Sequence, residues 1–385
     1  MTSVLVGIVW LGILLPLYHL VGYPLLLIVL APLFGRPVHK DRILPSVSLL
    51  ISAYNEESVI KQKLDNSLSL SYPNLQVIVN TEGSTDDTFA MACEYSNQGV
   101  MVLGGAKRRG KVAAVNRAVA MATHEIIVLS DANVFYDTNA ISSLVRNFAD
   151  PGVGAVTGCK TIRPSRGNAT QLTAAEAVYW RWENWLKKLE TRFWSTVGVH
   201  GEMLALKKEL FAPIPDGVIN DDAYLAMHCA KQGARVVYDE DARCWEAPSP
   251  TLADDDTRRS RITAGRVQLI KRLIVEGWLP WKESLCFLSH KVLRVAMPVL
   301  LLLGFVANVL VVGGGESSTN MRIIFAGQIS FLALAIFGAF GGNAGRMFLP
   351  ARVAAYVASG LASGLVGLLR AFRGKQDVLW VKAQR

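Results

Sequence analysis

The chain has 385 residues, of which 51% are hydrophobic and only 18% are charged. This hydrophobic content lies above that of an ordinary soluble protein, so the composition argues against a purely soluble chain. The formal net charge of +9 suits a protein that lies on anionic lipid and binds a phosphorylated substrate, and we expect no nucleic acid as a partner.

Four stretches contain no Asp, Glu, Lys or Arg, and they mark the candidate membrane crossings: 1–35, 295–315, 323–345 and 353–369. A helix that spans a bilayer needs about 20 mostly apolar residues, which the first three stretches supply. The fourth has only 17 uncharged residues, so the sequence leaves three or four crossings open. We expect 1–35 to be a retained anchor, because no basic residue precedes its apolar run and no small-residue cleavage site follows.

A basic segment, Arg36–Arg42, follows this anchor. Because positively charged loops stay on the cytoplasmic side, it predicts an integral plasma (inner) membrane protein whose soluble domain faces the cytoplasm. The five cysteines form no CxxC pair and are odd in number, which indicates neither a disulfide framework nor a zinc site.

Short apolar runs alternate with helix-periodic segments through the predicted soluble domain, 36–250. Three runs are bounded by turn residues, as buried parallel strands are: Ser46–Ser52, Gln76–Val79 and Glu125–Leu129. Strand followed by helix, three times over, predicts an open α/β sheet. Ligands of such sheets bind beyond the carboxyl ends of the strands, so we expect the chemistry in the segments 53–57, 80–87 and 130–133.

The segment 251–294 has the pattern of amphipathic helices at a membrane interface. An apolar stripe runs along it: Val267, Leu269, Ile270, Leu273, Ile274 and Trp278. A helix packed on the sheet is the alternative. Beyond it we expect membrane segments within 295–370 and a basic tail at 371–385. Four crossings would place this tail outside the cell, which conflicts with the rule that basic segments stay on the cytoplasmic side.

Two groups of residues suit a nucleotide diphosphate. A basic, glycine-containing loop opens an alanine-rich helix at Lys111, where backbone N–H groups and the lysine could bind an anion; a solvated basic turn is the alternative. Asp131 and Asn133 follow a buried strand, where their oxygens could hold a divalent ion. A simple helix cap is the alternative for such an aspartate.

Two further groups suit acid–base chemistry and phosphate binding. Asp221 and Asp222 open a helix that ends at Gly233. Adjacent carboxylates raise each other's pKa, which suits a general base, and N-capping explains only one of the two. Arg258 and Arg261 could clamp a phosphate. Binding of lipid headgroups is an equally good interpretation of these arginines.

Eight short motifs follow one another between residues 45 and 266: Ala53–Glu56, Glu82–Ser84, Gly110–Asn116, Asp131–Asn133, His200–Gly201, Asp221–Asp222, Gly233–Arg235 and Arg258–Arg261. Their order resembles that of the membrane-embedded family 2 glycosyltransferases, which include the cellulose, hyaluronan, chitin and poly-N-acetylglucosamine synthases. The flanking apolar stretches are similar in kind. The resemblance implies a GT-A fold, a nucleotide sugar donor, expected to be UDP-linked, and inversion at the anomeric carbon.

The resemblance also implies roles for individual residues. Four of them would line the base and ribose: Tyr54, Asn55, Glu56 and Glu82. Lys111 would contact the nucleotide or its phosphates, and Asp131 would contact the ribose and, together with Asn133, a divalent cation, Mg²⁺ or Mn²⁺. The other motif residues expected at the substrate are Ala53, Asn116, His200, Gly201 and Arg258.

For the chemical step, the resemblance implies that Asp222 takes the proton of the acceptor hydroxyl, with Asp221 as the next candidate. Arg261 would hold the departing diphosphate. Three departures from the family pattern matter: Glu82 replaces an aspartate, Asn133 replaces the second aspartate of the metal pair, and Ile262 replaces a tryptophan of the polymer synthases. Because that tryptophan stacks on the growing chain, its absence puts processive polymerisation in doubt.

These observations predict an inverting glycosyltransferase that moves a sugar to a polysaccharide or lipid acceptor at the membrane. Polymer synthesis with secretion and single transfer to a lipid carrier or glycolipid both stay open. A second alternative is a non-catalytic, nucleotide-sugar-binding partner of a synthase, against which the presence of Asp222, Lys111 and Arg261 argues. Membrane lipids are expected partners, and an oligomer or an accessory subunit is compatible with the sequence.

Overall fold

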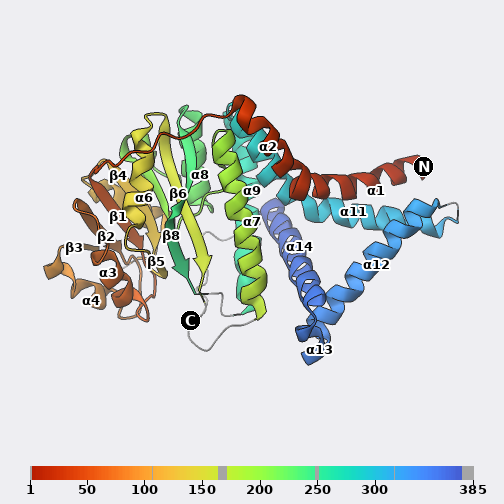
Figure 1. Ribbon diagram of the computed structural model, residues 1–385. Coiled ribbons are helices and arrows are strands. Elements are labelled where there is room, and N and C mark those ends of the chain that lie inside the picture. The colour runs from red at the N-terminus through yellow and green to blue at the C-terminus, as the bar shows by residue number, and fades with distance from the viewer. Residues whose placement is uncertain (1, 106, 164–170, 248–250, 316, 375–385) are drawn as a thin grey trace.

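A computed structural model describes residues 2–105, 107–163, 171–247, 251–315 and 317–374. The predicted domain boundary at 250 lies outside the described residues, as does the tail beyond Gly374. Figure 1 shows a part built on a β-sheet, joined through two long helices to an arm of apolar helices.

The sheet has eight strands: β1 (Val47–Ser52), β2 (Leu75–Asn80), β3 (Val100–Leu103), β4 (Ile126–Asp131), β5 (Val134–Tyr136), β6 (Val153–Ile162), β7 (Leu204–Lys207) and β8 (Arg235–Glu246). Their order is β3-β2-β1-β4-β7-β6-β8-β5. The three predicted strands correspond to β1, β2 and β4 and pair in parallel, which confirms an open α/β sheet. The sheet is mixed, because β7 runs antiparallel to β4 and β6.

Helices cover both faces of this sheet: α3 (Ile60–Leu68), α4 (Thr88–Cys93), α5 (Lys111–Met121), α6 (Ala140–Val145) and α8 (Asp221–Lys231), with short 3₁₀ turns η2 (Ser96–Gln98), η3 (Arg146–Ala149) and η4 (Lys208–Leu210). Alternate residues of β1 enter two separate cores. Leu49 and Ile51 pack into one core, and Leu50 packs into the other. Burial on both faces explains why these strands read as continuous apolar runs.

Two long helices connect the sheet to the arm: α7 (Gln171–Phe193) and α9 (Leu252–Glu276). Part of the predicted apolar stripe of α9 is buried, with Leu269 and Leu273 packed against Met227 of α8. Another part is exposed, since Ile274 keeps 64% of its surface accessible. The helix thus packs on the sheet domain and also presents apolar side chains outward.

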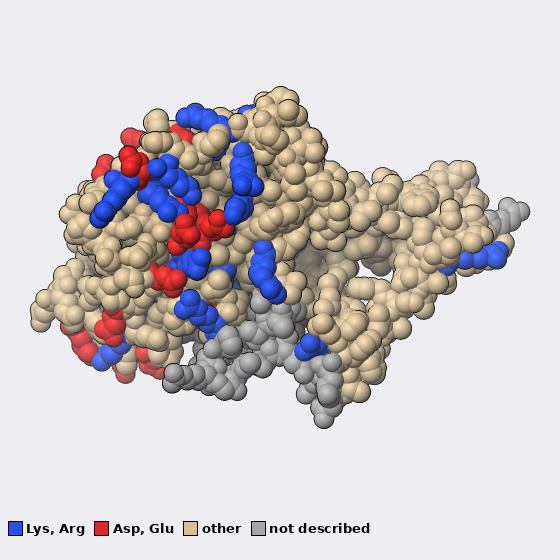
Figure 2. All heavy atoms as spheres, in the orientation of Figure 1, with Lys and Arg blue, Asp and Glu red and all other residues tan. Residues whose placement is uncertain are grey.

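The arm contains α1 (Thr2–Leu17), α2 (Tyr23–Phe34), α10 (Trp281–Cys286), α11 (Leu293–Gly313), α12 (Thr319–Phe340), α13 (Gly342–Met347) and α14 (Leu349–Arg373). Within the described ranges, four helical stretches are long and apolar enough to span a membrane: Thr2–Phe34, Trp281–Gly313, Thr319–Phe340 and Leu349–Arg373. The second is uninterrupted, so the predicted boundary at 294 falls inside a helix. Figure 2 shows that charged side chains crowd the sheet part, whereas the arm bears few.

Close helix contacts hold the arm together. Gly12 of α1 and Gly304 of α11 meet without side chains between them, because a Cβ built on Gly304 would lie 3.2 Å from the Cα of Gly12. On the other side, α14 packs along α9, where Asp256 accepts hydrogen bonds from Ser359 at 2.5 Å and Ser363 at 2.7 Å. The C-terminal apolar helix is therefore fastened to the sheet domain through α9.

Two π-helical turns bring the apolar helices to α7: η1 (Tyr18–Gly22) and η5 (Phe287–Val292). They face each other, since Tyr18 and Ser289 share a hydrogen bond of 2.9 Å. Tyr23, which follows η1, donates to Glu190 of α7 at 2.8 Å. Polar side chains therefore join the arm of apolar helices to α7.

Candidate active site

One cavity of about 1250 Å³ runs from the carboxyl ends of the strands to the apolar helices α11 and α14. Most of the predicted site residues line it: Ala53, Tyr54, Glu56, Glu82, Lys111, Asp131, Asn133, His200, Gly201, Asp221, Asp222, Arg258 and Arg261. Strand register explains how the first of these meet. Ser52, at the end of β1, lies opposite Asn80 of β2 and Asp131 of β4. The segments that follow these strands therefore open at one edge of the sheet.

The end of the cavity nearest β2 carries aromatic and charged groups. The guanidinium of Arg108 lies 3.9 Å from the centre of the Tyr54 ring. Glu82 is almost fully buried, and its Oε1 lies 4.0 Å from Nε of Arg109. A flat group between these side chains could stack and also donate hydrogen bonds to the carboxylate.

Two predicted residues, Asn55 and Asn116, do not line this cavity. Asn55 has a left-handed backbone, with φ of 54°, and its side chain accepts from the backbone N–H of Thr85 at 2.8 Å. The amide of Asn116 donates to the Ile214 carbonyl at 2.8 Å and accepts from its N–H at 2.9 Å. Both side chains hold loops in place rather than facing the cavity.

Lys111, the first residue of α5, lies among three carboxylates. Its Nζ is 2.8 Å from Asp131 Oδ1 and 3.7 Å from Asp221 Oδ2. Burial alone would lower the pKa of Lys111, but Asp131 and Asp221 outweigh it and hold this pKa above its usual value. The lysine is therefore charged, and it offsets the negative charge of the strand ends.

Asp222 faces the cavity from the first turn of α8. Burial, followed by the charge of Asp221, raises the pKa of Asp222 to about 7, while Lys111 opposes the rise. Its Oδ1 accepts a hydrogen bond from the Ala223 N–H at 2.7 Å. A carboxylate with this pKa can accept a proton near neutral pH, as a general base must.

Gly201 keeps the space between these groups open. A Cβ at this position would lie 3.2 Å from Nζ of Lys111 and 3.5 Å from Cβ of Asp222. The neighbouring His200 is held by a 2.9 Å hydrogen bond between Nε2 and the Gly158 carbonyl. Burial, followed by the charge of Lys187, lowers the pKa of His200. The gap at Gly201 leaves room for a substrate group beside the base.

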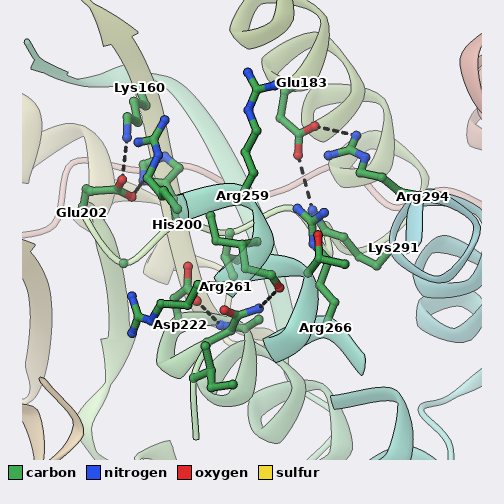
Figure 3. Close-up of a pocket in the computed structure, with 18 of the residues that line it drawn as sticks. Lys160, Glu183, His200, Glu202, Asp222, Arg259, Arg261, Arg266, Lys291 and Arg294 are labelled. Carbon is green, nitrogen blue, oxygen red and sulfur yellow. Dashed lines mark hydrogen bonds and ion pairs between the residues drawn. The ribbon is translucent and has the colours of Figure 1, made fainter. Parts of the chain in front are cut away.

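Arg261 of α9 lines the cavity, and Figure 3 shows it near Asp222. Burial lowers its pKa, and the carboxylates of Asp221 and Asp131 oppose this. Arg261 makes no hydrogen bond or ion pair with any residue that the structure describes, and its Nε is buried. A buried guanidinium without a partner indicates a site for an anion.

The donor atoms around Asp131 fit a hard divalent cation that is shared with a diphosphate. Asp131 offers one carboxylate, and the buried Oδ2 of Asp221 has no hydrogen-bond partner. The Asn133 amide instead donates to Glu246 at 3.2 Å. Among the described residues no three His, Cys, Asp or Glu side chains converge as metal ligands. A hard divalent cation such as Mg²⁺ needs no such cluster, because one or two carboxylates commonly hold it together with phosphate oxygens.

A buried ionic cluster beside His200 was not predicted from the sequence. Lys160 lies 2.5 Å from Glu202 and 2.6 Å from Glu246, and Figure 3 shows Lys160, Glu202 and His200 together. Nor were Glu183 and Arg266, which line the cavity, predicted as site residues. A usable signal existed for Glu183 and Glu190, because their spacing of seven places two carboxylates on one face of an aromatic-rich helix.

Comparison with known proteins identifies relatives of this arrangement. The model of the glycosyltransferase like family 2 matches residues 45–265. Poly-beta-1,6-N-acetyl-D-glucosamine synthase from Staphylococcus aureus is 25% identical over 234 residues, which are 60% of this chain and 56% of that protein. The synthase of the same name from Staphylococcus epidermidis is 24% identical over 231 residues, 59% of this chain and 56% of that protein. The chain thus spans little more than half the length of these curated relatives.

A solved structure matches almost the whole chain. It is a mannosyltransferase from Pyrobaculum calidifontis in complex with GDP-Man and Mn²⁺, with a TM-score of 0.74 and 26% sequence identity. The match covers 96% of this chain and 100% of that one, so it includes the apolar helices. It confirms the GT-A fold that the motifs imply.

Proposed function

Since this chain belongs to the family 2-like glycosyltransferases, we propose that it transfers a single sugar from a nucleoside diphosphate sugar to a lipid-anchored acceptor at the membrane surface. The observation that carries the proposal is the continuity of the cavity. It joins Tyr54 and Glu82 at the strand ends to Met297, Val353 and Val357 on α11 and α14. At about 1250 Å³ it exceeds the usual range of ligand pockets, about 300–1,000 Å³, and has room for a donor and part of an acceptor.

The chemistry follows from the residues around Asp222. An acceptor hydroxyl oxygen attacks the anomeric carbon, and its proton passes to the Asp222 carboxylate. The bond from the anomeric carbon to the diphosphate oxygen breaks, and the electron pair leaves with the nucleoside diphosphate. Arg261 and Lys111 are the cations nearest this developing charge, and preorganised charges of this kind are a large source of catalysis.

A divalent cation, Mg²⁺ or Mn²⁺, would supply further stabilisation of the diphosphate charge when bound. Asp131 is the residue that we propose to hold it, with Asp221 or Asn133 beside it. The presence of Mn²⁺ in the similar mannosyltransferase supports a divalent ion. That protein was solved with GDP-Man rather than with a UDP-linked sugar. The expected UDP-linked donor therefore stays a prediction, which the experiment below tests with both kinds of nucleotide sugar.

Two observations favour single transfer over polymer synthesis. Ile262 stands where polymer synthases have a tryptophan that stacks on the growing chain. In addition, the match to the mannosyltransferase covers all of that protein, whereas the match to the polymer synthases covers 56% of theirs. Polymer synthesis stays the second candidate, because these synthases are the curated relatives.

The decisive experiment uses the purified full chain with a panel of UDP- and GDP-linked sugars, Mg²⁺ or Mn²⁺, and a total lipid extract. We expect release of nucleoside diphosphate together with a product that partitions into organic solvent. A water-soluble product of increasing length would favour the polymer synthase. No release with any donor, although nucleotide still binds, would favour the non-catalytic alternative.

We also propose that the sheet domain faces the cytoplasm, as the basic residues after α2 predict. Cys93 on α4 is exposed and provides a natural reporter. A membrane-impermeant maleimide should label it in inside-out vesicles and not in sealed right-side-out vesicles, with Cys93→Ser as the control. The reverse pattern would place the domain outside.

A further inference from the structure

Beyond Asp222, toward the apolar helices, the cavity is lined by a second group of cations. Arg266 comes from α9, Lys291 from η5 and Arg294 from α11, and all three face the cavity. Figure 3 shows Arg266 and Lys291 pointing toward one another, on the opposite side of the site from Lys160. We call these three residues the interfacial cationic cluster.

One carboxylate faces this cluster directly. Glu183 of α7 lies 2.8 Å from Arg294 and 3.3 Å from Lys291. The next carboxylate, Glu190, is fully buried and already receives hydrogen bonds from Tyr23 at 2.8 Å and Thr196 at 2.7 Å. His290 bridges both carboxylates, at 3.1 Å from Glu183 and 2.7 Å from Glu190. The three cations therefore outnumber the two carboxylates of α7 that face them, Glu183 and Glu190, by one.

Arg266 carries this excess. It makes no hydrogen bond or ion pair with the residues that the structure describes. Burial, followed by the charge of Arg294, lowers its pKa, and the nearby carboxylates of Glu183 and Asp222 oppose this only in part. Because an uncompensated charge destabilises the fold, its presence beside the cavity suggests a ligand that brings the missing negative charge.

The surroundings describe the rest of that ligand. Past the cluster, α11 and α14 line the cavity mostly with apolar side chains, with Arg352 and Tyr356 among them: Met297, Pro298, Val353, Val357 and Leu361. These helices belong to the stretches that are long and apolar enough to span a membrane. A molecule that fills both regions therefore has an anionic group next to a hydrocarbon chain.

We propose that the interfacial cationic cluster binds a phosphate group of the lipid acceptor, whose hydrocarbon chain lies along α11 and α14. This inference rests on the proposed function. Guanidinium groups bind phosphate oxygens through paired, charge-assisted hydrogen bonds, which Arg266 and Arg294 can supply. Since Asp222 takes a proton, the attacking group is a hydroxyl carried by the lipid, and the phosphate serves as the handle that holds it near the base.

The test measures binding of short-chain probes to the detergent-solubilised full chain. Dioctanoyl phosphatidic acid carries phosphate and chains, dioctanoylglycerol carries only the chains, and inorganic phosphate carries only the anion. We expect phosphatidic acid to bind best, and Arg266→Gln to weaken it about tenfold, the scale of one charge-assisted hydrogen bond. Lys271→Gln, an exposed cation on the same helix, is the matched control and should leave binding unchanged.

Thermal unfolding of the same variants separates loss of the ligand site from loss of the fold. Because Arg266 has no ion-pair partner among the described residues, Arg266→Gln should keep or raise the melting temperature. Equal binding of phosphatidic acid by wild type and Arg266→Gln would overturn the proposal, and so would equal binding of dioctanoylglycerol. Equally tight inorganic phosphate would overturn the lipid part and leave a free-phosphate site.

Donor turnover, measured in parallel, distinguishes this proposal from the proposed function. If wild type releases nucleoside diphosphate from a sugar nucleotide but Arg266→Gln binds phosphatidic acid normally, the function stands and the phosphate site is wrong. If no donor turns over while phosphatidic acid binding still depends on Arg266, the phosphate site stands and the proposed function is wrong.

Discussion

The two sides of the cavity balance charge in opposite ways. On the strand side, Lys111 lies between Asp131 at the end of β4 and Asp221 at the start of α8, so this cation is paired with carboxylates. On the helix side, Lys291 and Arg294 share Glu183, and Arg266 has no ion-pair partner among the described residues. The strand side therefore suits a ligand that arrives with its own cation. The helix side requires a ligand that supplies an anion.

Asp222 lies where the two sides meet, and its loss should have the largest effect. Asp222→Asn keeps the shape of the side chain but removes the base, so transfer should fall by about 10²–10⁴-fold. Binding of nucleoside diphosphate, measured by calorimetry, should be unchanged. Asp216→Asn, at an exposed aspartate before the same helix, is the control. Normal turnover in Asp222→Asn would make this residue a helix cap and Asp221 the next candidate.

Arg261 tests whether an arginine from α9 works with the strand side. Arg261→Ala should reduce kcat/KM by about 2–4 kcal/mol, the scale for one preorganised charged contact, and should weaken diphosphate binding. Arg322→Ala, far away at the start of α12, should change neither quantity. If Arg261→Ala transfers sugar as fast as wild type, this arginine belongs with the lipid-facing cations instead.

The pH dependence of the rate reports directly on Asp222. Burial and Asp221 raise its pKa to about 7, and the base must be deprotonated, so transfer should fall about tenfold for each pH unit below 7. Stability should change in the other direction. Because folding raises the pKa of this aspartate, its contribution is present in acid and is lost as the pH rises toward 7.

Rate and melting temperature, followed on the same samples from about pH 5 to about pH 8, check both signs. A rate that does not change across this range would contradict a base with a raised pKa. Asp222→Asn should lose the dependence of the melting temperature that this group causes.

Asn133 offers the smallest and most specific test of the strand side. Asn133→Asp adds a carboxylate near Asp131 and should lower the metal concentration for half-maximal activity by about three- to tenfold. The gain is limited, because the new carboxylate would lie about where the amide now donates to Glu246, at 3.2 Å. Asn139→Asp is an exposed control. Coincident metal titrations would remove Asn133 from the ion site.

The strand side could be predicted from the sequence because its residues follow the ends of strands that pair in parallel, and such ends meet at one edge of a sheet. Short apolar runs locate β1, β2 and β4, and parallel pairing then brings Asp131 close to the residues after β1 and β2. The same motifs cannot separate a side chain that faces the ligand from one that supports a turn. Asn55 and Asn116 were expected at the substrate, yet their amides bond to loop residues.

The helix side could not be predicted, because its contacts join segments that are far apart in the chain. Glu183 and Glu190 meet residues of η5 and α11 that follow about a hundred positions later. No local pattern encodes such pairs. The second crossing was expected to start at 295, whereas the helix already starts at Trp281. The difference arises because Lys291 and Arg294 look like surface charges in the sequence, and only the structure places Glu183 beside them.

The contact between Gly12 and Gly304 has a consequence for biogenesis. In the order of synthesis, the whole sheet domain lies between α1 and α11, so Gly12 has no partner helix until that domain has been made. Helices associate in membranes through this kind of close packing rather than through the hydrophobic effect. Completion of the arm of apolar helices therefore waits for the last third of translation, and we expect a larger residue at Gly12 to impair this late helix packing rather than folding of the sheet.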